Sequence, residues 1–212
     1  MISGTRPSSA IGILVWVILC GGLAFAAGEN PTVGQSAGQS VGWSVEALVA
    51  LLKEQRAPAV PFEEATYSSL LTEPLTVRGQ LRFTPPATLE KVITSPYRER
   101  YVIDGDRVLF ESERKKTART ISLEDYPALR SFVEAFRATF TGDVGLLQRI
   151  YDVAVDGTRA QWSLLLRPRD AAGRSMVDSI LFTGSEGRVE TITIRSPDGD
   201  RSVMTLRQDA PR

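Results

Sequence analysis

Two pairs of carboxylates, Asp104 with Asp106 and Asp198 with Asp200, come nearest in this sequence to the spacing of a metal or acid–base site. A glycine separates the two acids of each pair. Asp-Gly between two strands is typical of a tight hairpin turn, because both residue types tolerate the left-handed conformation. The fuller oxygen series of a calcium loop is missing. The pattern favours turns, and a carboxylate-based hydrolase using Asp104 or Asp200 remains an alternative.

The 212 residues include no histidine and a single cysteine, Cys20. Histidine-dependent catalytic triads and imidazole-ligated zinc sites are therefore excluded. No phosphate-binding or dinucleotide-binding glycine motif occurs either. We expect a protein that is not an enzyme and that holds no metal or cofactor. The 25 basic and 25 acidic side chains give no net charge, which argues against nucleic acid as a partner.

A short basic run, Arg114 to Lys116, has the composition to meet anionic lipid or an acidic partner. Three contiguous charges are few for this purpose, because such attraction is weak and screened by salt. A solvated turn between two strands is the favoured interpretation.

Large apolar residues recur at helical spacing in the middle of the chain. This stripe consists of Leu129, Phe132, Val133, Phe136 and Phe140. It fits core packing, and it equally fits the inner face of a lid over a lipid cavity. The same two interpretations apply to the strand residues Leu81, Phe83 and Trp162, because core and cavity lining use the same residue types.

The beginning of the chain has the pattern of an export signal. Arg6 supplies the positive start, residues 10–23 are uncharged, and Ala24-Phe25-Ala26 is a small-x-small cleavage site. We expect residues 1–26 to be a signal peptide cleaved after Ala26, and the protein to be periplasmic. An uncleaved membrane anchor is one alternative. Acylation of Cys20 is another, although the residues just ahead of it are larger than a lipoprotein signal requires.

After the signal, residues 27–42 are rich in Gly, Ser and Gln and predict a flexible leader. A short amphipathic helix follows Ser44 and ends before Pro58. Two further helices are predicted over Leu123–Phe140 and Val144–Ile150. Elsewhere the apolar period is two, which predicts strands. The segment Phe62–Tyr67 leads into strands over Thr76–Phe83, Thr88–Thr94, Tyr97–Ile103, Arg107–Glu111, Thr117–Ser122, Tyr151–Asp156, Ala160–Arg167, Met176–Thr183, Arg188–Ser196 and Ser202–Leu206.

This order of elements predicts an α+β fold in one domain over residues 43–208. Ten to eleven antiparallel strands in one sheet must curl to cover their apolar face, which gives an incomplete β-barrel. The helices are natural lids on its concave side. A half-barrel with an apolar interior can hold an acyl chain.

Several stretches of the chain, in their order and in their exported context, also match a known pattern. They are Gly79–Pro86 with Leu89-Glu90, Asp104–Asp106, Leu123–Leu129, Thr141–Asp143, Trp162–Leu164 with Leu166–Pro168, and Asp198–Met204. Across these stretches the sequence resembles the LolA-type periplasmic lipoprotein carriers, and more closely a divergent LolA-like branch of that superfamily.

The resemblance implies a cavity that shields lipoprotein acyl chains between an inner-membrane releasing complex and an outer-membrane receptor. The residues expected to contact lipid are Leu81, Phe83, Phe132, Val133, Phe136 and Trp162. The well-known carriers have an Arg before the strand-ending Pro that holds the lid closed, whereas this chain has Thr84 before Pro85. We expect Arg82 on the same strand to act as the lid latch. The divergent branch is also associated with exported lipid or aryl-polyene products, so the identity of the cargo stays open.

The sequence therefore predicts a periplasmic carrier or chaperone that binds acylated cargo and serves the biogenesis of the outer membrane. Each methylene removed from water contributes about 0.8 kcal/mol, so such cargo needs a protein that hides its chains. The main alternative is an envelope protein-interaction module with a packed core and no lipid cavity.

Overall fold

The structure is a computed structural model that describes residues 43–54 and 59–207 of the chain. The predicted signal peptide, residues 1–26, and the predicted leader, residues 27–42, lie outside the described residues, and both stay predictions. Among the residues described, no helix is long and apolar enough to cross a membrane.

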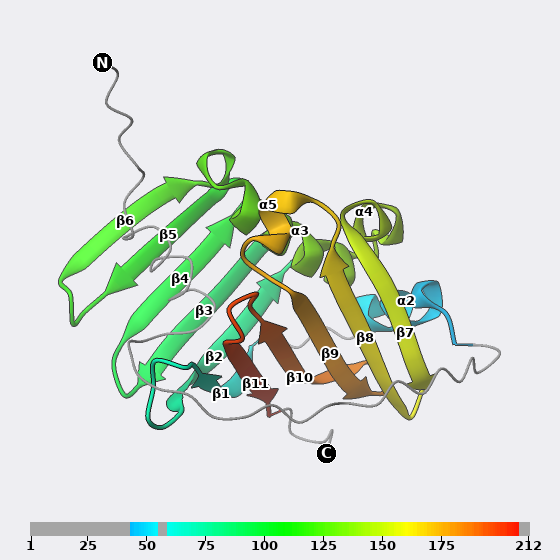
Figure 1. Ribbon diagram of the computed structural model, residues 1–212, viewed down its shortest axis with the longest axis horizontal. Helices are drawn as coiled ribbons and strands as arrows, with labels where there is room; N and C mark the ends of the chain where they lie inside the picture. The colour runs from blue at the N-terminus through cyan, green and yellow to red at the C-terminus, as the bar shows by residue number, and fades with distance from the viewer. Residues whose placement is uncertain (1–42, 55–58, 208–212) are drawn as a thin grey trace.

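The described residues form one antiparallel sheet of eleven strands (Figure 1). The strands are β1 (Val60–Tyr67), β2 (Leu75–Thr84), β3 (Thr88–Ser95), β4 (Glu99–Asp104), β5 (Arg107–Ser112), β6 (Thr117–Ser122), β7 (Tyr151–Thr158), β8 (Gln161–Pro168), β9 (Ser179–Ser185), β10 (Arg188–Arg195) and β11 (Arg201–Leu206). Their order across the sheet is β6-β5-β4-β3-β2-β1-β11-β10-β9-β8-β7. The first and last strands thus pair in the middle, with Phe62 opposite Leu206. Strands β6 and β7 are the two edges, so the sheet is not closed into a barrel.

The helices lie within the curl of this sheet. They are α2 (Val45–Glu54), the 3-10 helix η1 (Leu123–Asp125), α3 (Pro127–Thr141), α4 (Val144–Ile150) and α5 (Ala171–Arg174). Figure 1 shows α3 between one wall made of β2 to β6 and another made of β7 to β9. The prediction of an α+β fold with a curled antiparallel sheet is confirmed.

Local sequence explains where α3 begins and ends. The predicted helix from Leu123 is divided at Tyr126, because the residue before a proline disfavours helical backbone. Pro127 then occupies the first turn, where no amide donor is needed, and Gly142 ends the helix with φ of 87°.

The curvature of the sheet has a local cause on β2. The pairing register with β3 shifts between Arg78 and Gly79. A Cβ added to Gly79 would lie 1.8 Å from the backbone oxygen of Val92, so this close approach requires a glycine. Such an irregularity bends a strand and increases its twist, which helps the sheet to wrap around α3.

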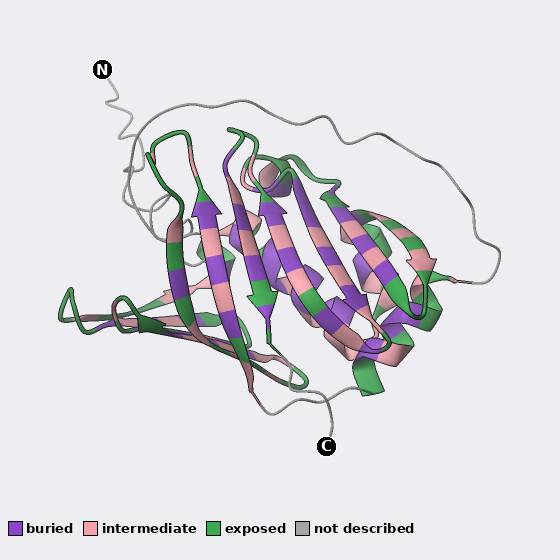
Figure 2. Cartoon of the chain, turned by 90° about the horizontal axis from the view of Figure 1, so that it is seen from below, coloured by how far each residue is buried: buried purple, intermediate pink, exposed green. Residues whose placement is uncertain are grey.

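Burial alternates along most strands, as Figure 2 shows by colour. The inward side chains Leu164 and Leu166 of β8 and Ile180 and Phe182 of β9 are fully buried and form the centre of the hydrophobic core. This alternation is the two-residue period read from the sequence.

Further differences from the sequence-based prediction lie around α5. The short helix α5 was not predicted, and the Asp170 side chain caps it by accepting a hydrogen bond from the Gly173 amide at 2.7 Å. Strand β9 begins at Ser179 and not at Met176, because Met176 and Val177 donate their backbone amides to Gly173 at the end of α5.

Candidate functional site

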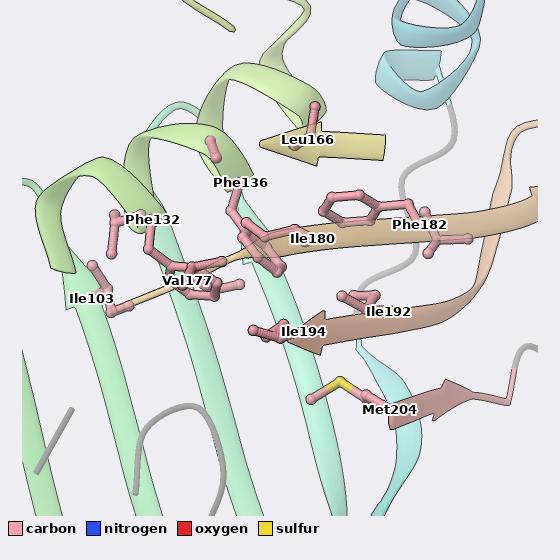
Figure 3. Packing of buried hydrophobic residues seen from close by; sticks show 14 of the residues in the cluster. Ile103, Phe132, Phe136, Leu166, Val177, Ile180, Phe182, Ile192, Ile194 and Met204 are labelled. Atoms are coloured by element: carbon pink, nitrogen blue, oxygen red, sulfur yellow. The ribbon is translucent and has the colours of Figure 1, made fainter. Parts of the chain in front are cut away.

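Helix α3 rests on the concave face of the sheet through aromatic side chains. The ring of Phe136 lies 5.3 Å from that of Phe182 on β9, and the ring of Phe140 lies 5.5 Å from that of Phe83 on β2. Phe132 adds a further ring at 4.9 Å from Phe136. Figure 3 shows Phe132 and Phe136 directed from α3 toward the strands. Its ring contacts therefore reach β2 in one wall of the curled sheet and β9 in the other.

A cavity of about 50 Å³ lies between α3 and the sheet. Its lining is mostly apolar, with one tyrosine and three polar or charged side chains. The lining residues are Leu81, Leu89, Ile103, Phe132, Phe136, Ile192, Ile194, Met204, Tyr101, Glu64, Lys91 and Ser202. This volume admits a few water molecules, whereas sites for drug-sized ligands enclose roughly 300–1,000 Å³. The site as it stands is filled by the side chains of α3.

The structure brings only some of the predicted lipid-binding residues to this cavity. Leu81, Phe132 and Phe136 line it. Val133 is fully buried in the core and Phe83 packs on Phe140, but neither is among the lining residues. Trp162 lies near the beginning of β8, where its indole donates to the backbone oxygen of Glu186 at 2.9 Å. Trp162 is thus placed as a core residue outside the cavity.

The structure also places the predicted latch elsewhere. Arg82 is exposed and alternates with the half-buried Leu81 and Phe83, so it lies on the convex face of β2, away from α3. Arg137 of α3 is an arginine that joins the lid to the sheet by hydrogen bonds. Its guanidinium donates to the backbone oxygens of Ala87, at 3.0 Å, and Gly105, at 2.5 Å, in the β2–β3 and β4–β5 turns.

The electrostatic surroundings of Arg137 are mixed. Burial lowers the pKa of Arg137 from its ordinary value, while the carboxylates of Asp106, Glu134 and Asp104 oppose this shift. A guanidinium keeps its charge in proteins, so these bonds have a charged donor and are stronger than neutral ones.

Glu64, Lys91 and Ser202 form a buried polar cluster in the cavity wall. The Lys91 ammonium lies 2.5 Å from Glu64 Oε2, and the Ser202 hydroxyl donates to Glu64 Oε1 at 2.5 Å. Glu64 and Ser202 are each 1 % exposed and Lys91 is 7 % exposed. The Lys91 ammonium also lies 5.4 Å from the centre of the Phe62 ring. Both carboxylate oxygens of Glu64 are therefore paired.

A second buried polar cluster lies next to the first on β4 and β5. The Tyr101 hydroxyl donates to Glu99 Oε2 at 2.7 Å, and the Ser112 hydroxyl donates to Glu99 Oε1 at 3.1 Å. Tyr101 is opposite Lys91 in the sheet register, so the two clusters are neighbours. Burial raises the pKa of Tyr101 well above its ordinary value, and the hydrogen bond to Glu99 adds to this effect.

Sequence reasoning missed both clusters, although a signal was present. Lys91 falls between Leu89 and Ile93 in the two-residue period of β3, so it occupies an inward position. Glu64 likewise follows Phe62 at an inward position of β1. A charged residue in the inward phase of a half-buried strand must be paired inside the protein, and this rule points to both residues.

The two Asp-Gly-Asp motifs, residues 104–106 and 198–200, lie at turns. Gly105 and Gly199 have positive φ of 52° and 91°, as turn glycines do. Asp104 accepts from the Thr88 hydroxyl and Asp200 accepts from the Ser68 hydroxyl, so both acids fasten loops. The basic run at Arg114 occupies the turn between β5 and β6, as predicted.

The solved structures that resemble this chain are distant from it. A LolA superfamily protein of Nitrosomonas europaea is 13% identical, with a TM-score of 0.42 over 80% of this chain and 96% of that chain. The Pseudomonas aeruginosa MucA/MucB complex is 12% identical, with a TM-score of 0.37 over 79% of this chain and 58% of that chain. A DUF1329 family protein of Desulfovibrio piger is 11% identical, with a TM-score of 0.36 over 79% and 93%. Likeness at this level does not bear on function.

A search of curated proteins returns no match. The sequence profile of the family described as outer membrane lipoprotein carrier protein LolA-like, in contrast, matches residues 37–211, which is most of the chain. That match agrees with the curled sheet and its helical lid. The chain belongs to this LolA-like family.

Proposed function

We propose that this protein is a periplasmic, non-catalytic carrier that shields the acyl chains of lipoproteins, or of another lipidated envelope product, during transfer toward the outer membrane. The observation that carries the proposal is the apolar concave face beneath α3, which the helix covers mainly with aromatic side chains. Membership of the LolA-like family supports it. A releasing complex in the inner membrane and a receptor in the outer membrane are the partners such a carrier needs.

The energetics of acyl transfer require a shielded site. Each methylene left in water costs about 0.8 kcal/mol, so a chain of about a dozen methylenes costs about 10 kcal/mol in the aqueous periplasm. A carrier must therefore offer an apolar surface of comparable size. The sheet residues that line the cavity under α3 are mostly apolar.

Helix α3 must move before a chain can enter, because a cavity of about 50 Å³ is too small. Its ring contacts with Phe83 and Phe182 are apolar, and an acyl chain in the same place would provide similar contacts. The hydrogen bonds from Arg137 to two turns and the ion pair of Arg130 with Asp106 are polar contacts that would break. Opening therefore replaces the apolar contacts between α3 and the sheet with apolar contacts between the acyl chain and the sheet.

Uptake of a fluorescent fatty-acyl probe tests this function. Leu81 lines the cavity and is half-buried, so Leu81→Asn should weaken probe binding at least about tenfold while the protein stays folded. Val155→Asn is the matched control, since Val155 is also half-buried on the inner face but lies on β7, outside the cavity lining. Equal probe binding by both variants and the wild type would remove the acyl site from this face.

One observation favours a second function. The small size of the cavity suits an envelope protein-interaction module whose core is already complete. Such a module predicts no affinity of the wild-type protein for any acyl probe.

A further inference from the structure

The buried ion pair in the cavity wall has no evident part in holding the fold together. A buried ion pair contributes little net stability, because the desolvation of both charges offsets their attraction. Apolar residues of similar volume would serve a packed core equally well. Glu64 and Lys91 nevertheless both line the space between α3 and the sheet, where a ligand would lie.

The surroundings of the pair are those of a binding site and not of a surface. Glu64 lies opposite Met204 on β11 and Val77 on β2 in the sheet register. Lys91 lies opposite Leu81, another lining residue. The pair is therefore a polar point in an otherwise apolar wall, as expected where a mostly apolar ligand has one polar group to orient.

We propose that the Glu64–Lys91–Ser202 cluster is the subsite for the linkage carbonyl of the cargo, and that it selects acyl chains joined through an ester or amide bond. This inference rests on the proposed carrier function. The carbonyl oxygen accepts a hydrogen bond from the Lys91 ammonium, while Lys91 stays paired with Glu64.

The charges of the region exclude a free fatty acid as the preferred ligand. Among the described residues of this region, Glu64 and Glu99 are buried carboxylates, and the buried ammonium of Lys91 pairs with Glu64. A ligand carboxylate would add a further negative charge in a place from which water is largely excluded, which is unfavourable. An ester or amide carbonyl is neutral and accepts a hydrogen bond, so it adds no charge.

Hydrogen bonding, in turn, distinguishes an acyl ester from a hydrocarbon. A hydrocarbon fills the apolar part of the site but offers Lys91 no acceptor. A hydrogen bond to a charged donor changes affinity by about tenfold or more, so the wild-type protein should bind the ester more tightly by about that factor.

Competition against a bound fluorescent acyl probe tests this selection. The competitors are methyl laurate, laurate and dodecane, which share their chain length and differ in the terminal group. The protein is the full chain, expressed with its own export segment and purified from the envelope. We expect methyl laurate to compete at least about tenfold better than either of the others.

A variant with an apolar wall, Glu64→Leu/Lys91→Met/Ser202→Ala, shows whether the cluster causes the preference. It removes both charges together, so no buried charge is left unpaired. The preference for methyl laurate over dodecane should disappear, with dodecane bound at least as tightly as by the wild type. Ser112→Ala is the control, since Ser112 bonds Glu99 in the neighbouring cluster and does not line the cavity. Its ranking of the three competitors should match the wild type.

Two results would overturn the inference while leaving the carrier function intact. One is a wild-type protein that binds all three competitors equally. The other is an apolar-wall variant that keeps the preference for the ester. A wild-type protein that binds neither the probe nor any competitor would instead overturn the carrier function, and the subsite with it.

Discussion

The inner face of the sheet has two regions of different chemistry. The packed region, on β8 and β9, consists of Leu164, Leu166, Ile180 and Phe182, all fully buried and apolar. The polar region, on β1, β3 to β5 and β11, contains Glu64, Lys91, Glu99, Tyr101, Ser112 and Ser202, which are almost as completely buried. Both regions belong to one continuous curled sheet, so neither the fold nor the degree of burial explains the difference.

The difference separates stability from binding. In the packed region, burial of large apolar side chains supplies the free energy of folding. In the polar region, paired charges contribute little to that free energy, and several of them line the cavity. Stability and ligand selection can therefore be changed independently, and the following predictions test this division.

The largest effect on stability is expected in the packed region. Phe182→Ala removes a fully buried ring that contacts Phe136 of α3, and it should lower the free energy of unfolding by about 3–5 kcal/mol. Urea unfolding followed by circular dichroism measures this loss. A loss below about 1 kcal/mol would show that this part of the face is not the core.

In the polar region, removal of one partner of the ion pair should lower stability more than replacement of the whole Glu64–Lys91–Ser202 cluster. Lys91→Met leaves the Glu64 carboxylate buried without its ammonium and should cost about 3 kcal/mol. The apolar-wall variant, which replaces Glu64 and Ser202 as well, should recover most of this loss. Urea midpoints of the two variants provide the comparison. A single variant as stable as the wild type would mean that Lys91 does not hold Glu64 in solution.

Loss of the Arg137 contact between α3 and the sheet is expected to lower stability by a smaller amount. Arg137→Leu removes the hydrogen bonds to Ala87 and Gly105, and it should lower stability by about 1–2 kcal/mol and speed uptake of the acyl probe. Stopped-flow fluorescence measures the uptake. Arg130→Leu is the comparison on the same helix. It also loses a contact to the β4–β5 turn, the ion pair with Asp106, but this pair and the pair with Glu134 are exposed and contribute about 0–1 kcal/mol. Equal uptake rates in the two variants would remove Arg137 as a latch.

Ionisation of a buried tyrosine should lower the stability of the protein, but only in alkaline solution. Burial raises the pKa of Tyr151, beside α3, to about 12, whereas tyrosine in an unfolded chain ionises near pH 10. The folded state favours the neutral phenol, so the stabilisation is fully present below about pH 10 and is lost as the pH rises through about 12. Ultraviolet difference titration of the wild type against Tyr151→Phe should show that Tyr151 ionises near pH 12. Ionisation of Tyr151 near pH 10 would contradict its burial.

The two-residue hydrophobic period predicts much of this fold, because inward and outward side chains alternate within each strand. β2 and β3 follow from Leu81, Phe83, Leu89 and Ile93 without any knowledge of the rest of the chain. The pairing of β1 with β11 could not be predicted in this way, since it joins residues about 140 positions apart, such as Phe62 and Leu206.

The candidate site was predicted less completely, for a physical reason. Leu81, Phe132 and Phe136 line the cavity as expected, because apolar residues in the inward phase are directed there. Arg82 is close in sequence to the family's latch position, but its phase on β2 places it on the convex face. Arg137 reaches two turns that are distant in sequence, and only the folded chain shows that α3 lies beside them.

Native mass spectrometry of the protein, purified gently from the periplasm of its own host, tests the carrier function most directly. We expect a co-purified acylated species whose mass identifies an ester- or amide-linked chain, and whose size distinguishes a lipoprotein from a smaller lipid. A protein that is empty and also takes up no fluorescent acyl probe would contradict the carrier function. The face beneath α3 would then be a completed core, and the protein an interaction module.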